Sequence, residues 1–402
     1  MTSLAENAAR YLEFLCNEIE TRQVGSNGNR QATAYVADTL SAFGYQVEMP
    51  SFDCVDWAGE KAELCIAGRN FEVFPSPYSL PCHTVAALRT AGTLAELQAV
   101  ECKGEILMLQ GELTCEQIMP KNFPFYNPEL HQLIVSLVES KAPAAIVAAT
   151  SRNPELAGAV YPFPLFEDGD FNIPSVFTTE EIGQQLLPYA GQTVSLLSQA
   201  QRIPSTGCNV IGRINPGAPS KITICAHIDA KIGTPGALDN AAGIVTLLLI
   251  ADLLQNYTGS NEIELLAMNG EDYYGANGEK QYLEQNEGRL GRILSFVNMD
   301  GLGFQTGKTA FSFYNQTKER ITAFRSILQK YPGIYEGEPW YQGDHMALVM
   351  NGVPAIAITS EKFMEIEQNY AHTAADVTAL VDVQRLIEAA RAVSLIVEQL
   401  EG

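Results

Sequence analysis

The chain has 402 residues, of which 46% are hydrophobic, and its formal net charge is -22 at pH 7. This length supports a large hydrophobic core or two, and we expect one long domain interrupted by an insertion. The acidic balance excludes nucleic acid as a partner, because that binding requires a basic surface. A solvated acidic surface accounts for such a charge, and its negative field would also favour substrates that carry a free amine.

The sequence predicts neither a membrane span nor an export signal. No stretch approaches the ~20 unbroken apolar residues of a membrane span. Residues 1–7 lack the basic start and the apolar run of a signal peptide. We therefore expect a cytoplasmic protein with no membrane partner, unless a leader has been removed. The eight cysteines show no C-x-x-C spacing, which favours reduced thiols; a disulfide stays possible among the five between residues 54 and 115 if the protein is exported.

Two helices and a strand are expected at the N-terminal end. Apolar residues at helical spacing predict the first helix over residues 5–20. The second is expected over residues 29–43, with Gly44 as its stop signal. Residues 45–49 then alternate between apolar and polar side chains, as a strand does.

The pattern of apolar and polar residues is different between residues 51 and 203. Short alternating runs and frequent prolines replace the helical periodicity, and one helix is expected within residues 128–140. This segment gathers no convergent set of chemically active side chains. We interpret residues 51–204 as a separate, small β-rich domain.

From residue 205 onward, strands and helices alternate, which predicts an α/β domain with a mainly parallel mixed sheet sandwiched by helices. The expected strands cover residues 221–226, 262–268, 292–298, 309–314 and 354–359. The expected helices cover residues 240–256, 276–287, 317–331, 345–351 and 383–400. Residues 1–50 and 205–402 would therefore form one discontinuous domain around the insertion.

Polar side chains recur where the predicted strands end. If the strands are parallel, their carboxyl ends meet at one edge of the sheet, which is where ligands bind in such folds. One of these residues opens the helix after the first strand, and two more precede the last helix. The set is His227, Asp229, Asp239, Glu271, Asp272, Asp300, His372 and Asp376.

Two imidazoles and several carboxylates form a mixed nitrogen and oxygen donor set that suits zinc. Two ions about 3.5–4 Å apart would need one bridging carboxylate and two terminal ligands each. The set supplies these ligands and leaves one carboxylate to act as general base. Each residue alone is as easily a cap, a turn residue or a packed histidine, and only their joint placement favours a metal site.

The ordered set resembles metallopeptidase family 28, whose members are co-catalytic di-zinc aminopeptidases and their relatives. The motifs that carry the resemblance are His227-x-Asp229, Asp239-Asn240-Ala241-Ala242-Gly243, Asn269-Gly270-Glu271-Asp272, Asn298-Met299-Asp300 and His372-Thr373-x-x-Asp376. The resemblance covers roughly residues 5–50 and 205–402. Residues 103–107 and 172–176 of the insertion resemble the protease-associated domain that many members carry at this point.

The resemblance implies a ligand for each of two zinc ions. Asp239 would be the bridging ligand, His227 and Asp300 would complete one site, and Asp272 and His372 would complete the other. The family usually has glutamate at the position of Asp272. Because aspartate is one methylene shorter, the backbone must come closer to reach a ~2.1 Å bond. The resemblance therefore implies two zinc ions, of which the second depends on that shorter side chain.

The resemblance also implies roles for the residues around the metals. Glu271 would be the general base and acid, and Tyr370 could donate a hydrogen bond to the oxyanion. Asp229 would orient His227, and Asp376 would orient His372. A cis peptide is expected between Asp239 and Asn240.

The function implied is a zinc-dependent exopeptidase, most simply an aminopeptidase that removes N-terminal residues from short peptides by metal-activated water. Its substrate would be a peptide with a free N-terminus. A glutaminyl cyclase-like activity with one zinc and a non-catalytic binding protein are alternatives. Carboxypeptidase activity is a further alternative, and it would need a basic residue to hold the substrate's carboxylate; Arg289 and Arg292 flank the third strand.

Overall fold

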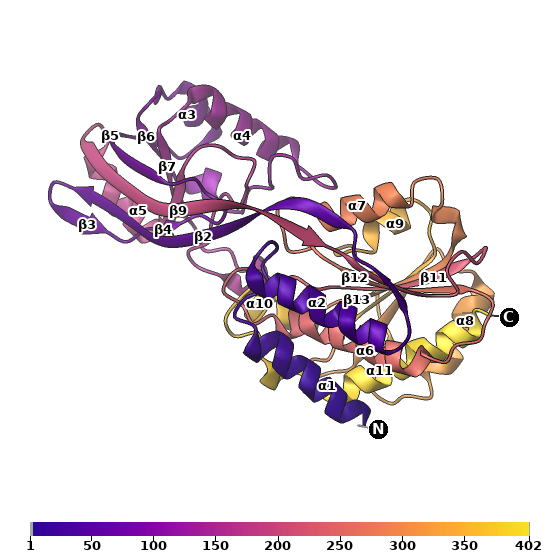
Figure 1. Ribbon diagram of the computed structural model, residues 1–402. Coiled ribbons are helices and arrows are strands. Elements are labelled where there is room, and N and C mark those ends of the chain that lie inside the picture. Colours follow the sequence, from indigo (N-terminus) through magenta and orange to yellow (C-terminus); the bar gives the residue numbers. More distant parts are fainter. Residues whose placement is uncertain (1–2, 402) are drawn as a thin grey trace. The chain divides into compact units, whose positions relative to one another are not determined.

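The structure is a computed structural model that describes residues 3–401. It divides into two compact units (Figure 1). The sheet unit runs up to Asp53 and resumes at Thr206, and the inserted unit is Cys54–Ser205. The boundaries expected from the sequence, after residues 50 and 204, lie within three residues of this division.

A mixed eight-stranded sheet forms the centre of the sheet unit, in the order β1-β10-β12-β11-β13-β16-β14-β15. The strands are β1 (Gln46–Glu48), β10 (Val210–Ile214), β11 (Lys221–His227), β12 (Glu262–Met268), β13 (Ile293–Met299), β14 (Thr309–Tyr314), β15 (Ile334–Glu336) and β16 (Ala355–Ser360). The four central strands β12, β11, β13 and β16 are parallel, and β10 and β14 flank them in the antiparallel sense. The predicted α/β class with a mainly parallel mixed sheet is therefore confirmed.

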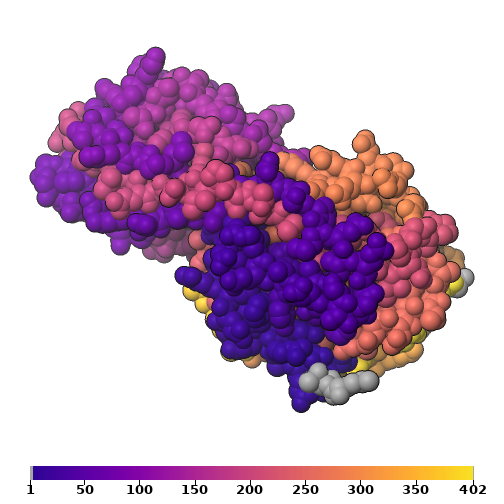
Figure 2. Space-filling view, viewed as in Figure 1, coloured from indigo at the N-terminus to yellow at the C-terminus, as the bar shows by residue number. Residues whose placement is uncertain are grey.

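Helices cover both faces of this sheet (Figure 1). One face packs against α1 (Leu4–Glu13), α2 (Asn27–Ala42), α6 (Ala242–Leu254), α8 (Lys318–Leu328) and α11 (Val383–Gln399). The other face packs against α7 (Asn277–Gln285) and α9 (Met346–Met350). In Figure 2 the indigo residues of α1 and α2 form a continuous outer surface over the first face. The parallel strands are consequently buried on both sides, which explains their unbroken apolar sequences.

The most apolar helix lies inside this unit. Among the described residues, Ala237–Leu254 is the one helical stretch long and apolar enough to cross a membrane, and 83% of it is buried in the unit. It consists of a short π-helical turn, Ala237–Ala241, followed by α6. The helix expected over residues 240–256 therefore begins differently, because Asp239 and Asn240 have non-helical backbone angles. That irregular start places Asp239 at the carboxyl edge of the sheet.

The inserted unit has its own eight-stranded sheet, in the order β3-β2-β9-β5-β6-β7-β8-β4. The strands are β2 (Ser51–Ile66), β3 (Arg69–Phe71), β4 (Phe74–Pro75), β5 (Cys82–Ala91), β6 (Ile106–Leu109), β7 (Ala145–Thr150), β8 (Ser175–Thr179) and β9 (Thr193–Cys208). Alternate residues of β6 enter two different cores. One core includes α3 (Leu94–Ala99) and α4 (Glu129–Lys141), and the other includes α5 (Glu180–Leu186). The unit is β-rich, with helices on both faces of its sheet.

Several elements were not expected from the sequence, among them β10 and β15 of the central sheet. The long strands β2 and β9 carry exposed charged and polar residues, which hide their alternation. The helix α10, Phe363–Asn369, buries only Ile366 and therefore has no apolar period to reveal it. Short helical turns occupy Phe14–Glu18, Gly111–Thr114, Ala157–Ala159, Leu187–Tyr189, Leu290–Arg292 and Thr378–Leu380. Of these differences, α10 matters most, because it contributes to the site described next.

Candidate metal centre

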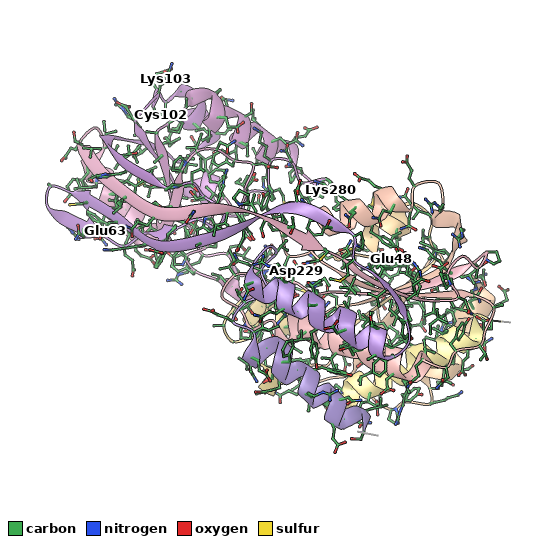
Figure 3. The ribbon with its side chains drawn as sticks, viewed as in Figure 1. Glu48, Glu63, Cys102, Lys103, Asp229 and Lys280 are labelled. Atoms are coloured by element: carbon green, nitrogen blue, oxygen red, sulfur yellow. The ribbon has the colours of Figure 1, made fainter. Side chains whose placement is uncertain are left out.

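The predicted site residues converge at the carboxyl ends of the parallel strands. His227 is the last residue of β11, and Asp229, labelled in Figure 3, lies two residues beyond it. Asp300 directly follows β13, and Asp272 lies in the loop after β12. Because these strands are parallel, the side chains that follow them share one edge of the sheet.

Asp239 lies between the two histidines. Its Oδ1 is 3.2 Å from His227 Nε2, and its Oδ2 is 3.1 Å from His372 Nε2. His227 Nε2 is also 3.6 Å from Asp300 Oδ1, and His372 Nε2 is 3.0 Å from Asp272 Oδ1. The five side chains thus form two three-residue groups that share Asp239, with donor atoms within 4.8 Å of one another in each group.

The donor atoms fit a cation better than they fit one another. Within residues 3–401, His227 Nδ1, His227 Nε2 and Asp272 Oδ2 are buried and have no hydrogen-bond partner. Buried polar atoms are normally satisfied, so unsatisfied atoms that converge indicate a ligand. Tetrahedral zinc at about 2.1 Å from its ligands separates those ligands by about 3.4 Å, close to the spacings found here.

The protonation of the histidines reflects the surrounding carboxylates. Burial opposes a charge on His227, yet Asp229, Asp239 and Asp300 together raise the pKa of this imidazole well above its ordinary value. Burial also opposes a charge on His372, but Asp272 and Asp239 raise the pKa of this imidazole well above its ordinary value. The cluster therefore attracts positive charge strongly, which a divalent ion also supplies.

Glu271 lies beside both groups and faces the cavity above them. Burial, together with the nearby carboxylates Asp272 and Asp300, raises the pKa of Glu271 well above its ordinary value, against the opposing effect of His227. Glu271 lines a cavity of about 210 Å³ that also reaches Asp239 and His372. A carboxyl group whose pKa is raised holds a proton more readily than an ordinary carboxylate does.

Asp229 has contacts that go beyond the predicted one. Its Oδ1 lies 3.7 Å from His227 Nδ1, facing the imidazole as expected but too far for a strong hydrogen bond. The same carboxylate accepts hydrogen bonds from the amides of Gly270, Glu271 and Asp272 at 2.7, 3.3 and 3.0 Å. Asp229 therefore holds the loop that carries the candidate base and one candidate ligand.

Asp376 was expected to orient His372, but it binds other groups. Its Oδ1 accepts from the amide of Leu238 at 2.8 Å, and its Oδ2 accepts from the amide of Asp239 at 3.0 Å. In the part of the chain that the structure describes, the carboxylate has no hydrogen bond to His372. Asp376 thus fixes the backbone of the shared aspartate, because the loop before the last helix folds over the start of α6. The peptide bond between Asp239 and Asn240 is cis, as the resemblance implied.

Tyr370 lies at the end of α10, and its ring centroid is 5.7 Å from that of Phe304. The cavity that contains Glu271 is not lined by Tyr370. The contact with Phe304 gives the tyrosine a packing role, and its donation to an oxyanion stays a prediction.

Sequence reasoning missed a group of residues on α10. Phe363, Ile366 and Glu367 line the cavity together with Trp340. Burial and the nearby Asp239 raise the pKa of Glu367 to about 7. The position of α10, immediately before His372, is the one signal that could have drawn attention to these residues.

Arg22 is a second residue that was missed. Its side chain is buried and donates hydrogen bonds to the carbonyl oxygens of Leu15, Ile228, Pro235 and Gly236, at 2.7 to 3.0 Å. These bonds tie the segment after β11 and the segment before Asp239 to the N-terminal region. Arg22 thereby holds the backbone that runs between the candidate ligands His227 and Asp239.

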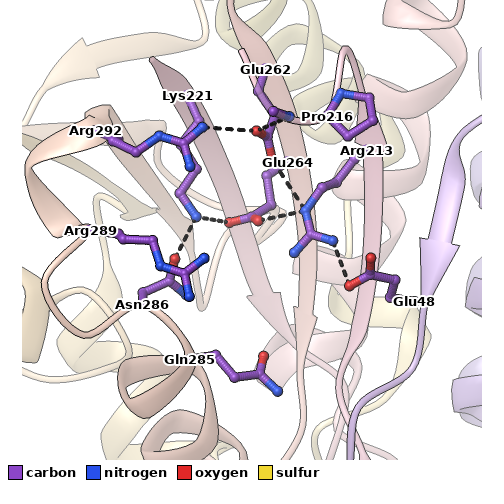
Figure 4. A pocket seen from close by; sticks show the side chains of 11 residues that line it. Glu48, Arg213, Pro216, Lys221, Glu262, Glu264, Gln285, Asn286, Arg289 and Arg292 are labelled. Carbon is purple, nitrogen blue, oxygen red and sulfur yellow. Dashed lines mark hydrogen bonds and ion pairs between the residues drawn. The ribbon is translucent and has the colours of Figure 1, made fainter. Parts of the chain in front are cut away.

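The two arginines considered for a carboxypeptidase lie elsewhere. Arg289 and Arg292 line a separate cavity of about 310 Å³ at the amino ends of β11 and β12 (Figure 4). That end of the sheet is opposite to the edge that carries His227. Among the described side chains that line the cavity at Glu271, none is lysine or arginine.

Comparisons with known proteins agree with this geometry. Residues 209–397 match the model of peptidase family M28. A probable lipoprotein aminopeptidase of Mycobacterium tuberculosis is 24% identical over 295 residues, which is 70% of this chain and 55% of that protein. The chain therefore spans about half the length of this curated relative.

Solved structures share the fold. The aminopeptidase from Aneurinibacillus sp. strain AM-1 matches with a TM-score of 0.74 at 21% identity, over 98% of this chain and 93% of that one. A zinc aminopeptidase from Bacillus subtilis matches with a TM-score of 0.74 at 20% identity, over 98% of this chain and 94% of that one. The segment that matches peptidase family M28, residues 209–397, contains all five predicted metal ligands.

Proposed function

We propose that this chain is a zinc-dependent aminopeptidase that hydrolyses N-terminal residues from short peptides. One observation carries the proposal: two groups of metal-ligating atoms share Asp239, and the free carboxylate of Glu271 lies beside them in one cavity. The family match and the named relatives, which are aminopeptidases, support the same activity.

Zinc would be held at two positions. His227, Asp239 and Asp300 would hold one ion, and Asp239, Asp272 and His372 would hold the other. When bound, zinc polarises a carbonyl oxygen and lowers the pKa of water. The short side chain of Asp272 supports the second position, since its Oδ1 is 3.0 Å from His372 Nε2 and its Oδ2 has no partner within residues 3–401.

Glu271 would move the proton. As a carboxylate it accepts a proton from the attacking water, and as an acid it gives that proton to the leaving amine. Its raised pKa suits a group that must hold the proton between these two steps. Asp229 supports this role by holding the amide of Glu271 in place.

The charge of the cavity favours a terminal amine of the substrate over a terminal carboxylate. Its described lining includes Glu271 and Asp300 and no lysine or arginine. A carboxypeptidase needs a cation to hold the terminal carboxylate, and Arg289 and Arg292 lie at the other end of the strands. A free N-terminus is therefore the substrate feature that this site suits.

We also infer that the inserted unit is a protease-associated domain. The two segments that resemble it run into β6 and β8, which flank β7 in the inserted sheet. Replacing residues 54–205 by a short flexible linker and measuring hydrolysis of short and long peptides would test whether this unit restricts substrate length.

The activity is tested with a panel of aminoacyl-coumarin amides and their N-acetylated counterparts. We expect cleavage of the free-amine substrates only, abolished by chelator and restored by zinc. Cleavage of acetylated substrates would contradict an aminopeptidase. If no substrate is cleaved by zinc-loaded protein, the proposal fails, and cyclisation of peptides with N-terminal glutamine would then identify a glutaminyl cyclase.

A further inference from the structure

One carboxylate in the cavity has no role in the chemistry proposed above. Glu367 lies on α10 and lines the cavity, and within the described chain no hydrogen bond or ion pair engages its side chain. Two positions earlier, Glu365 forms an ion pair with Lys362 at 3.2 Å, and its side chain is 41% exposed. The same helix thus carries one glutamate that is neutralised at the surface and one that is left unpaired inside the site.

Apolar side chains line the same cavity as this unpaired carboxylate. Phe363 and Ile366 precede Glu367 by four residues and one residue, and all three line the cavity. The ring of Trp340 lies 5.4 Å from that of Phe363, at an interplanar angle of 33°. An apolar wall beside a lone carboxylate complements a long side chain with an aliphatic stem and a cationic end.

The residues assigned to the metals and to the proton leave Glu367 available to the substrate. Asp239, Asp272 and His372 are committed to the proposed metals, and Glu271 to the proton. Glu367 comes from α10, which holds none of those residues, yet it opens into the same cavity. It can therefore contact a substrate side chain while the scissile bond lies over the metal ligands.

We propose that Glu367 makes this site selective for peptides whose first residue is arginine or lysine. The inference rests on the proposed aminopeptidase function and names its substrate class. The guanidinium or ammonium group pairs with the Glu367 carboxylate, and the aliphatic stem packs against Trp340 and Phe363. A charge-assisted hydrogen bond of this kind discriminates about 10- to 100-fold against a neutral side chain.

The test compares arginyl- and citrullinyl-coumarin amides, because citrulline has nearly the shape of arginine and no charge. We expect the zinc-loaded protein to hydrolyse the arginyl substrate with a kcat/KM at least about 10-fold higher. The substitution Glu367→Gln, which preserves side-chain volume, should lower that ratio to about 1–3. The matched control Glu365→Gln should leave the ratio at its original value.

The outcomes separate this inference from the proposed function. Cleavage by the wild-type protein with a ratio that Glu367→Gln does not lower would overturn the selectivity while leaving the aminopeptidase intact. An equal loss on both substrates would also overturn it, because that result assigns Glu367 to the α-amine or to folding.

Absence of all cleavage would refute the activity instead. In that case calorimetry of free arginine and free citrulline binding to the zinc-loaded protein still tests the selectivity for a cationic side chain. We expect arginine to bind at least about 10-fold more tightly, and Glu367→Gln to remove the difference. Equal binding of the two amino acids by the wild-type protein would overturn the inference.

Discussion

The two ends of the central sheet each hold a buried charged cluster, and the clusters differ in how completely their atoms are paired. At the amino ends of β11 and β12, Lys221 and Arg213 bind Glu264 (Figure 4). At the carboxyl ends, His227 and His372 face Asp239. Both clusters contain buried carboxylates and cationic side chains, so composition alone does not separate them.

Pairing is complete at the amino end. Glu264 accepts hydrogen bonds from Lys221, Thr223, Tyr282 and Arg213 at 2.7 to 3.1 Å. Lys221 in turn donates to Asn286 and Tyr282 as well as to Glu264. No buried atom of these side chains lacks a partner within residues 3–401. A cluster satisfied in this way stabilises the fold and requires no ligand.

Pairing is incomplete at the carboxyl end, where His227 and Asp272 keep buried atoms without hydrogen bonds. Unsatisfied buried polar atoms cost about 1–3 kcal/mol each unless a ligand completes them. Incomplete pairing, rather than buried charge, therefore distinguishes the candidate site. Substitutions in the two clusters should therefore differ in their effects on zinc binding and on stability.

The largest effect is expected from Asp239→Asn. This change removes the charge shared by both ligand groups, so zinc affinity should fall more than about 100-fold and hydrolysis should be lost. Metal content by mass spectrometry and the zinc-induced rise in Tm measure the change. The control Asp38→Asn alters an exposed aspartate on α2 and should keep full zinc binding. An Asp239→Asn protein that binds zinc as the wild type does would refute the shared-ligand assignment.

The next effect is expected from Glu271→Gln. It should lower kcat by about 10²- to 10⁴-fold while zinc content stays at the wild-type level, because the amide cannot accept the proton. Steady-state kinetics beside metal analysis distinguish these quantities. Loss of zinc together with activity would make Glu271 a ligand instead, as the third group of His227, Glu271 and Asp272 permits.

Disrupting the paired cluster around Glu264 should lower the stability of the fold and leave zinc affinity unchanged. Glu264→Gln leaves Lys221 buried without its carboxylate and should lower the free energy of unfolding by about 3–5 kcal/mol. The surface pair Arg325–Glu336 supplies the control, since Glu336→Gln should cost only about 0–1 kcal/mol. Urea unfolding measures both. Zinc affinity of the folded Glu264→Gln protein should equal that of the wild type.

The same cluster predicts a pH dependence. Burial opposes the charge on Glu264, but Lys221 and Arg213 lower its pKa below the ordinary value of 4.5. A pKa lowered by folding adds stability that is present above pH 4.5 and is lost as pH falls toward the folded pKa. Unfolding at several pH values below 4.5 should therefore show a shallower decline for Glu264→Gln than for the wild type. Equal slopes would contradict the assignment.

The smallest effect is expected from Tyr370→Phe. The ring contact with Phe304 survives this change, so kcat should fall less than about 3-fold if packing is its role. A loss of about 10²-fold or more would restore the predicted donation to the oxyanion.

Much of the site followed from local patterns. The apolar runs of β11, β12 and β13 predicted a parallel sheet, and the polar residues after them predicted a shared edge. The predicted contact of Asp376 with His372 was wrong, because the carboxylate binds amides 137 and 138 residues away along the chain. Contacts of that range leave no trace in the periodicity of a short segment.

The sequence by itself determined the candidate ligands, their order and the edge of the sheet where they meet, because parallel strands bring their carboxyl ends together. The tertiary structure alone decided which atoms stay unpaired, and it placed Arg22 and Glu367 around them. Those placements depend on how loops and the short helix α10 fold over the strand ends. Such contacts arise from packing between distant segments, and no local pattern of apolar residues encodes them.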